Sequence, residues 1–132
     1  MILDTHALLW MDRNDPTLGK TARALIETDW QAGQLAVSAI SFWEVAMLAE
    51  RGRITLPLPV SLWREDWLKA GLIEIPLDGR IALLATELAD LHRDPADRFI
   101  LATAIERNTG LITADRALLA WPGKLSRVAA DA

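Results

Sequence analysis

The sequence predicts a three-layer α/β/α fold with a mainly parallel central sheet. Short apolar runs typical of buried strands alternate with amphipathic, helix-like stretches along the whole chain. Hydrophobic residues make up 52% and charged residues 24%, a composition that excludes a disordered chain. The 132 residues suffice for one domain with a real core but not for two, and they contain no internal repeat or linker. We therefore expect a single domain over residues 1–132.

The N-terminal half of the chain alternates apolar strand-like runs with stretches that have apolar residues at helical spacing. Its expected elements are a strand at 1–3, helices at 5–11 and 16–32, a strand at 34–38 and a helix at 41–50. Gly33 and Gly52 stand just past two of these helices, where glycine commonly ends a helix. Ser41 and Glu44 match the capping-box pattern, so we expect Ser41 to cap the helix that it opens.

The C-terminal half continues the same alternation. Its expected elements are a helix at 60–70, a strand at 72–75, helices at 80–91 and 95–105, a strand at 111–113, a helix at 116–121 and an edge strand at 126–129. Asp94 is a good N-cap and Pro95 fits the first helical position, so these two residues start the nearly all-apolar helix at 95–105. We expect capping to be the role of Asp94.

Composition excludes several classes of protein. The chain has no cysteine, so disulfides, thiolate metal sites and thiol nucleophiles are excluded, and a reducing cytoplasm is the expected location. No apolar run approaches the roughly 20 residues of a membrane span, and Asp4 and His6 interrupt the N-terminal run, so we expect neither a signal peptide nor a membrane partner. A net charge of −4 disfavours DNA packaging, but it suits a nuclease whose carboxylates are offset by metal ions.

Four acidic residues share one kind of position in the predicted fold. Asp4 and Asp115 follow strands, whereas Glu44 and Asp97 lie near the starts of helices. The carboxyl ends of parallel strands meet at one edge of the sheet, so these side chains can converge there. Four bare carboxylates would repel one another, and Mg²⁺ or Mn²⁺, which prefer oxygen ligands, would relieve that repulsion. The residues alone also allow Glu44 and Asp97 to act as helix-start acids that meet free N–H groups.

Four stretches of the chain resemble, in the right order, the acidic motifs of PIN-domain ribonucleases, and above all the VapC toxins of bacterial toxin–antitoxin pairs. They are ILDTHALLW, SAISFWEVA, HRDPADRFILATA and LITADRAL, and the resemblance runs from residue 1 to about residue 119. It implies a PIN-like fold and a Mg²⁺- or Mn²⁺-dependent endoribonuclease. Asp4, Glu44, Asp97 and Asp115 would form its acidic cluster, with Asp4 and Asp97 as the most direct metal ligands.

The same resemblance implies partners. Family members are typically homodimers that act on RNA and are neutralised by a cognate antitoxin whose tail covers the site. The other end of the antitoxin binds operator DNA, so contact with DNA would be indirect. The chain departs from the family in having Ala96 where a bulky residue is common and in having a short first strand, and no family motif follows Trp121.

Several neighbours of the acids are candidates for supporting roles. Thr5, Ser41 and Thr113 place hydroxyl groups near the expected rim, where they can bond to metal ligands. Arg98 and Arg116 each directly follow a cluster acid, and either pairing with carboxylates or contact with RNA phosphates suits an arginine there.

Two histidines flank the acids. His6 and His92 could transfer protons, but we favour local hydrogen bonding for both, because an all-oxygen metal site can activate water without a histidine.

Two other functions remain open on the residues. A phosphatase could use Asp4 as its nucleophile, although His6 stands where such enzymes carry a second acid. A non-catalytic module could bind metal or RNA and keep the acids as helix caps. No Gly-rich phosphate loop follows any predicted strand, which disfavours an enzyme with a nucleotide cofactor.

Overall fold

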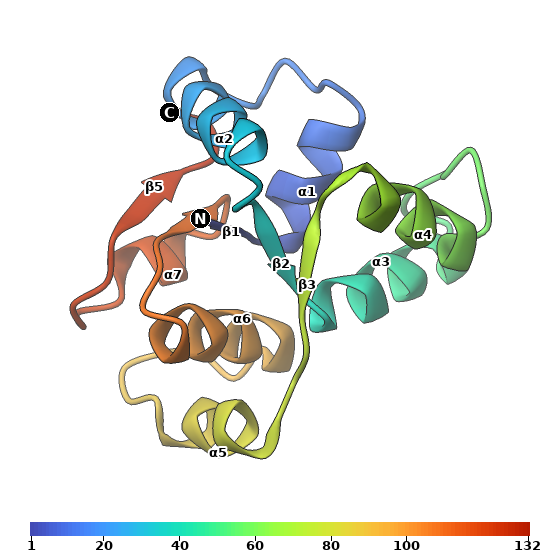
Figure 1. Ribbon diagram of the computed structural model, residues 1–132. Coiled ribbons are helices and arrows are strands. Elements are labelled where there is room, and N and C mark those ends of the chain that lie inside the picture. The colour runs from blue at the N-terminus through green and yellow to red at the C-terminus, as the bar shows by residue number, and fades with distance from the viewer.

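The computed structural model describes residues 1–132 and contains a five-stranded sheet, parallel throughout, with the strand order β3-β2-β1-β4-β5 (Figure 1). The strands are β1 (Ile2–Leu3), β2 (Ala36–Ser38), β3 (Ile73–Ile75), β4 (Leu111–Thr113) and β5 (Arg127–Ala129). The predicted α/β architecture is confirmed, and the edge strand expected at 126–129 is β5.

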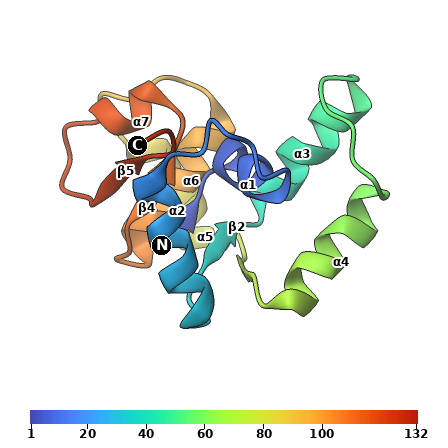
Figure 2. The same ribbon diagram turned by 90° about the horizontal axis from the view of Figure 1, so that it is seen from above.

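Seven helices cover the two faces of this sheet. They are α1 (Thr5–Asp12), α2 (Lys20–Gln31), α3 (Ile40–Glu50), α4 (Val60–Ala70), α5 (Gly79–Glu87), α6 (Pro95–Glu106) and α7 (Arg116–Ala120). Helices α1 to α4 share one apolar cluster with the sheet, and α5 to α7 share the other (Figures 1 and 2). None of the helices is long and apolar enough to cross a membrane.

The two apolar clusters are separated by the alternation of side chains along each strand. Leu3 lies beside Ile112 in the register of β1 and β4, and both face the cluster of α1 to α4. Ile2 lies beside Leu111 and faces α5 and α6 instead. All four side chains are fully buried, because β1 has a strand on each side and a helical layer on each face. The next residue, Asp4, is therefore held in the middle of the fold.

Helix α2 begins at Lys20, four residues later than the sequence predicts, and the far end of the chain explains the difference. The backbone N–H of Gly19 donates to the carbonyl of Ala130 (2.9 Å), and that of Thr21 donates to the oxygen of Ala132 (3.0 Å). The last residues thus supply acceptors for N–H groups at the start of α2, which have no partner inside the helix. The local sequence around α2 cannot predict these hydrogen bonds, because their acceptors lie more than 100 residues away along the chain.

Helix α5 ends at Glu87, so the prediction of a helix to residue 91 is wrong. Leu88 has an extended backbone (φ −69°, ψ 111°), and an irregular segment follows it. The guanidinium of Arg98 donates hydrogen bonds of 2.7–3.1 Å to the carbonyls of Ala85, Leu88, Leu91 and His92. These bonds satisfy the carbonyls released by the end of the helix, so the segment is stable without helical structure. The remaining predicted elements agree with the structure to within two residues.

The capping box predicted for Ser41 and Glu44 is absent. Helix α3 begins at Ile40 and has Ala39 at its N-cap without any side-chain cap. Both side chains that would form the box turn toward Thr5 instead. The capping interpretation of Ser41 and Glu44 is therefore wrong, and the two residues belong to the site described next.

Candidate metal centre

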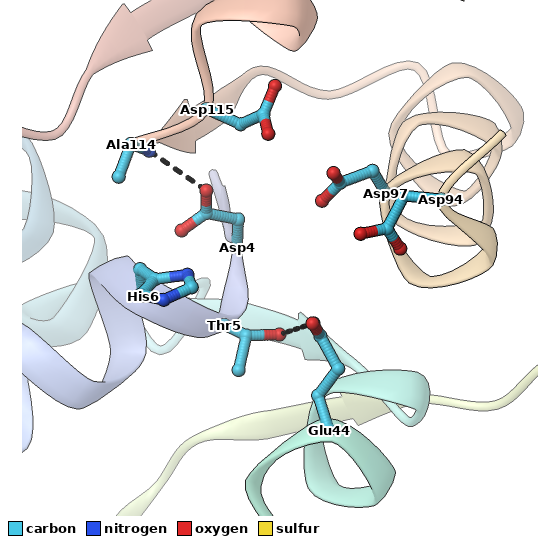
Figure 3. Close-up of a pocket in the computed structure, with 8 residues that line it drawn as sticks. All are labelled: Asp4, Thr5, His6, Glu44, Asp94, Asp97, Ala114 and Asp115. Carbon is cyan, nitrogen blue, oxygen red and sulfur yellow. Dashed lines mark hydrogen bonds between the residues drawn. The ribbon is translucent and has the colours of Figure 1, made fainter. Parts of the chain in front are cut away.

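Four acidic side chains from four elements meet at the carboxyl edge of the sheet (Figure 3). Asp4 follows β1, Asp115 follows β4, Glu44 lies one turn into α3, and Asp97 lies in the first turn of α6. The structure thus brings together the four acids that the sequence singles out. They line a cavity of about 250 Å³ together with Thr5, His6, Asp94 and Ala114.

Asp4 is the most firmly held of the acids. Its Oδ1 accepts a hydrogen bond from the N–H of Ala7 (2.8 Å), which caps α1. Its Oδ2 accepts from the Thr113 hydroxyl (2.5 Å) and from the N–H of Ala114 (2.8 Å). The residue is only 3% exposed, and burial raises the pKa of Asp4 even though these three donors favour the charged form. The carboxylate is consequently fixed in one orientation.

Glu44 is held by a pair of hydroxyl groups. The Thr5 hydroxyl lies 2.5 Å from Oε1 of Glu44 and 3.0 Å from the hydroxyl oxygen of Ser41. Because a hydroxyl has one proton, the bond to the carboxylate uses that of Thr5, and Ser41 then donates to Thr5. Burial raises the pKa of Glu44 in spite of this bond. Thr5 thus contacts Glu44 directly, and Ser41 supports Thr5.

Asp97 and Asp115 face each other and act as a pair. Burial, followed by the negative charge of Asp115, raises the pKa of Asp97 to about 8. Burial acts to raise the pKa of Asp115 as well, but the N–H of Leu118 and the side chain of Asp97 donate to it, and the net effect lowers that pKa. At neutral pH the two carboxyl groups therefore share one proton, which Asp97 holds.

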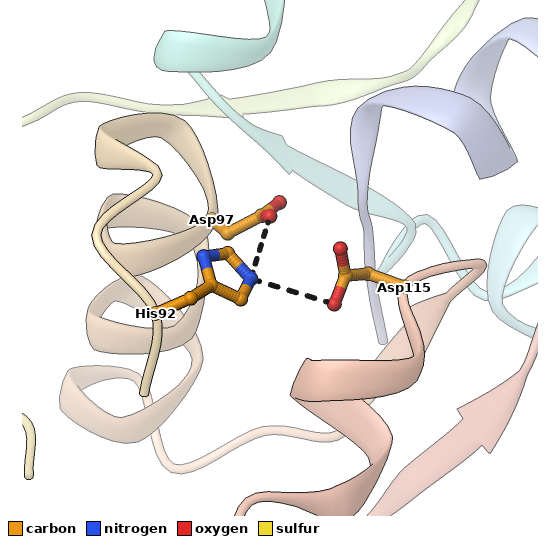
Figure 4. A group of neighbouring side chains, drawn as sticks. All are labelled: His92, Asp97 and Asp115. Atoms are coloured by element: carbon orange, nitrogen blue, oxygen red, sulfur yellow. Dashed lines mark ion pairs between the residues drawn. The ribbon is translucent and has the colours of Figure 1, made fainter. Parts of the chain in front are cut away.

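His92 lies against this pair (Figure 4). Its Nε2 is 3.2 Å from Oδ2 of Asp97 and 3.6 Å from Oδ1 of Asp115, and one atom of each residue lies within 4.8 Å of the other two. Its Nδ1 accepts a hydrogen bond from the backbone N–H of Asp94 (3.1 Å), so the proton of a neutral His92 is assigned to Nε2. The local hydrogen bond predicted for His92 is confirmed. His6 is exposed at the cavity and lines it.

Asp94 both caps a helix and lines the acidic cavity. Its Oδ1 accepts from the N–H of Ala96 (3.0 Å), which confirms that it caps α6. It also lines the cavity and adds a fifth acidic residue to it. Sequence reasoning assigned Asp94 to capping alone, although its spacing of three residues from Asp97 already put both on one side of a helix start.

The two candidate arginines lie away from the acids. Arg98 gives its donors to backbone carbonyls between α5 and α6, so it takes up neither of its two predicted alternatives, pairing with a cluster carboxylate or contact with RNA phosphates. Arg116 pairs with Asp131 (2.8 Å) and has a side chain that is 74% exposed, so it is not paired with a cluster acid either. No lysine or arginine lines the cavity. The site is therefore a negatively charged cavity in which carboxylate oxygens, the donors that Mg²⁺ and Mn²⁺ prefer, outnumber the nitrogen donors of His6 and His92.

Comparison with known proteins identifies the family. The sequence matches the PIN domain family over residues 1–123. The chain belongs to the PIN-domain family. This PIN domain is 39% identical over 119 residues to Ribonuclease VapC22 of Mycobacterium tuberculosis, which covers 89% of this chain and 88% of the relative.

Solved structures share the fold of this PIN domain. VapBC2 from Rickettsia felis, bound to a DNA fragment from its promoter, superposes with a TM-score of 0.71 at 17% identity and covers 97% of this chain and 96% of that chain. A toxin–antitoxin complex from Klebsiella pneumoniae gives 0.67 at 22% identity and covers 98% and 96%. The PIN-like fold implied by the four motifs is thus confirmed.

Proposed function

We propose that this PIN domain is a Mg²⁺- or Mn²⁺-dependent endoribonuclease that hydrolyses phosphodiester bonds of RNA. The convergence of Asp4, Glu44, Asp97 and Asp115 on a cavity without lysine or arginine carries the proposal. Burial, followed by the negative charge of neighbouring acids, raises the pKa of Asp97 to about 8, and a bound divalent ion would offset that negative charge. The curated relative is itself named a ribonuclease, which supports the choice of substrate.

Each acid has a separate task in this proposal. Asp97 and Asp115 would hold the ion with their facing carboxylates, and Asp4, which three hydrogen bonds fix in place, would complete the set of ligands. Glu44, held by Thr5, would orient a water molecule or bind the ion directly. A divalent ion bound there supplies water activation and stabilises charge that develops on the phosphoryl group.

The geometry disfavours the phosphatase alternative. Asp4 is buried and three hydrogen bonds fix its carboxylate, so the side chain cannot readily move to form a bond to phosphorus. Because Oδ1 accepts only one hydrogen bond, it retains a lone pair that a metal ion in the cavity can use. His6 lies at the cavity in place of the second acid that such chemistry uses.

Metal-dependent cleavage of a panel of structured RNAs, tRNA among them, tests the nuclease. Wild-type protein should cleave only with Mg²⁺ or Mn²⁺, and Asp97→Asn should fold but not cleave. Asp90→Asn is a matched control, because Asp90 is exposed and its φ of 60° suits asparagine. Cleavage by Asp97→Asn without metal would overturn the proposal. Metal binding by folded protein with no cleavage of any RNA would favour a non-catalytic metal- or RNA-binding module.

We further propose that this PIN domain is the toxin of a bacterial toxin–antitoxin pair. Solved structures that share its fold include a toxin–antitoxin complex from Klebsiella pneumoniae and VapBC2 from Rickettsia felis, which supports this role. The protein would act in the cytoplasm as a homodimer, and a cognate antitoxin would cover the acidic cavity and make the only contact with DNA. Expression in a bacterial host should stop growth, co-expression of the antitoxin should restore it, and Asp97→Asn should have no effect. Equal growth arrest by Asp97→Asn would contradict this role.

A further inference from the structure

A second cavity, of about 310 Å³, lies beside the acidic one. It runs along α3 and the start of α6, and we call it the α3–α6 groove. Glu44 and Asp94 line both cavities, so the groove adjoins the candidate metal centre. Its other lining residues are Trp43, Met47, Leu48, Arg51, Pro95 and Ala96.

Trp43 is the exceptional residue of this groove. It is 51% exposed, and no other aromatic side chain of the protein is an exposed large hydrophobic group. Its neighbour Phe42 is buried and packs edge-on against Trp63, whereas the Trp43 ring has no aromatic partner and its indole N–H has no hydrogen-bond acceptor. Single exposed apolar residues are common on protein surfaces. The Trp43 indole lies in the groove next to Glu44, a candidate metal ligand. It can therefore offer a flat ring to a bound molecule that also reaches the metal centre.

Arg51 gives the groove its second recognisable feature. Trp43, Met47 and Arg51 are spaced four residues apart on α3 and its C-cap, which places them along one side of the helix. The spacing of eight residues separates Trp43 from Arg51 by roughly 12 Å along the axis. Arg51 is exposed and pairs with no carboxylate in the structure. An aromatic ring near the acids and a free guanidinium farther out match, in that order, a base and a phosphate of one nucleic-acid strand.

We propose that the α3–α6 groove binds single-stranded RNA next to the bond that is cut, with a base stacked on Trp43 and a backbone phosphate on Arg51. This inference rests on the proposed ribonuclease function and adds the form of the substrate. A base can reach the groove only if it is unstacked from its neighbours, so loops and single-stranded segments would be the substrates and duplexes would not. Stacking on an indole ring tolerates every base, so Trp43 would contribute affinity more than sequence choice.

Binding of a short single-stranded RNA, measured by fluorescence anisotropy on the cleavage-silent Asp97→Asn background with Mg²⁺, tests the proposal. Trp43→Ala should weaken binding roughly five- to hundredfold, while Trp43→Phe, which keeps a ring, should retain most of the affinity. Arg51→Ala should weaken binding and reduce its dependence on salt. Leu83→Ala is the matched control, because Leu83 is 67% exposed on α5 and lines neither the groove nor the acidic cavity.

Equal affinity of the Trp43→Ala and Leu83→Ala proteins would overturn the proposal. It would also be overturned if Trp43→Ala left RNA binding intact and instead abolished self-association or antitoxin binding, because a protein would then occupy the groove. In the active protein, Trp43→Ala should raise KM with little change in kcat. If wild-type protein cleaves no RNA but binds it through Trp43, the proposed hydrolysis fails while the groove assignment stands.

Discussion

The hydroxyl of Thr113, at the end of β4, donates a 2.5 Å hydrogen bond to Oδ2 of Asp4, at the end of the neighbouring strand β1. The same hydroxyl oxygen accepts a hydrogen bond from the backbone N–H of Asp115 (3.0 Å). One buried side chain therefore ties two acids of the candidate metal centre to each other and to the sheet.

Replacing Thr113 by valine should damage both stability and metal binding. Valine has nearly the same shape but no hydroxyl, so Asp4 loses a donor and the Asp115 N–H loses its acceptor, at a cost of about 1–3 kcal/mol in the free energy of unfolding. Loss of a residue that orients a ligand should weaken metal binding by roughly 10- to 100-fold. Denaturant unfolding and calorimetric titration with Mn²⁺ measure the two effects. Thr113→Ser should behave like wild type, and equal defects in the serine and valine proteins would refute the role of the hydroxyl.

The stability of the metal-free protein should fall as pH rises from about 4 to 8. Asp97 has a pKa of about 8 in the folded protein, well above its usual 3.8, so within this range the folded state binds more protons than the unfolded state. Raising the pH therefore removes a proton that stabilises the fold. Thermal unfolding in the presence of a chelator from pH 5 to 9 reports the slope, and Asp97→Asn should flatten it. An unchanged slope in that variant would assign the effect to other groups.

Metal binding should release a proton near neutral pH. The ion must displace the proton that Asp97 shares with Asp115, so the affinity should rise about tenfold per pH unit below pH 8 and level off above it. Titration calorimetry at pH 7 in two buffers with different ionisation enthalpies counts the released protons. A heat of binding that is the same in both buffers would mean that no proton leaves.

The sequence predicts the layers of this fold and the meeting of its acids for a common reason. Strands and helices follow local periodicity, and the ends of parallel strands lie at one edge, so the positions of Asp4 and Asp115 within their motifs already determine their convergence. The features that sequence reasoning missed depend on distant partners. The Ser41 hydroxyl does not cap α3 because it forms a hydrogen bond with the hydroxyl of Thr5. Helix α5 ends early because the guanidinium of Arg98 donates hydrogen bonds to carbonyls at and beyond its end.

Arg98 should be far more important for stability than Arg116, although each directly follows a cluster acid. Arg98→Ala leaves the carbonyls between α5 and α6 without their charged donor and should cost about 2–4 kcal/mol. Arg116→Ala breaks one exposed ion pair with Asp131 and should cost less than about 1 kcal/mol. Denaturant unfolding of both variants makes the comparison. Similar losses would show that the hydrogen bonds of Arg98 do not hold the segment.

Two glycine-to-alanine changes should have opposite effects. A Cβ at Gly19 would lie 2.0 Å from the backbone oxygen of Ala132, so Gly19→Ala must displace the end of the chain and should cost about 1–3 kcal/mol. A Cβ at Gly79, at the start of α5, meets nothing within 4 Å, and alanine there should add up to about 1 kcal/mol. The midpoints of thermal unfolding give the order of the two variants and the wild type. A reversed order would exclude tight packing at Gly19.

The place of β1 in the sheet governs when the acidic cavity can exist during synthesis. Asp4 leaves the ribosome well before its partners Thr113 and Ala114, which follow 109 and 110 positions later. A nascent chain has no complete cavity until translation has passed residue 115, and a prematurely terminated chain carries Asp4 without its strand neighbour β4. Any chemistry at this site therefore has to wait until β4 and Asp115 have been synthesised and β4 has joined β1 in the sheet.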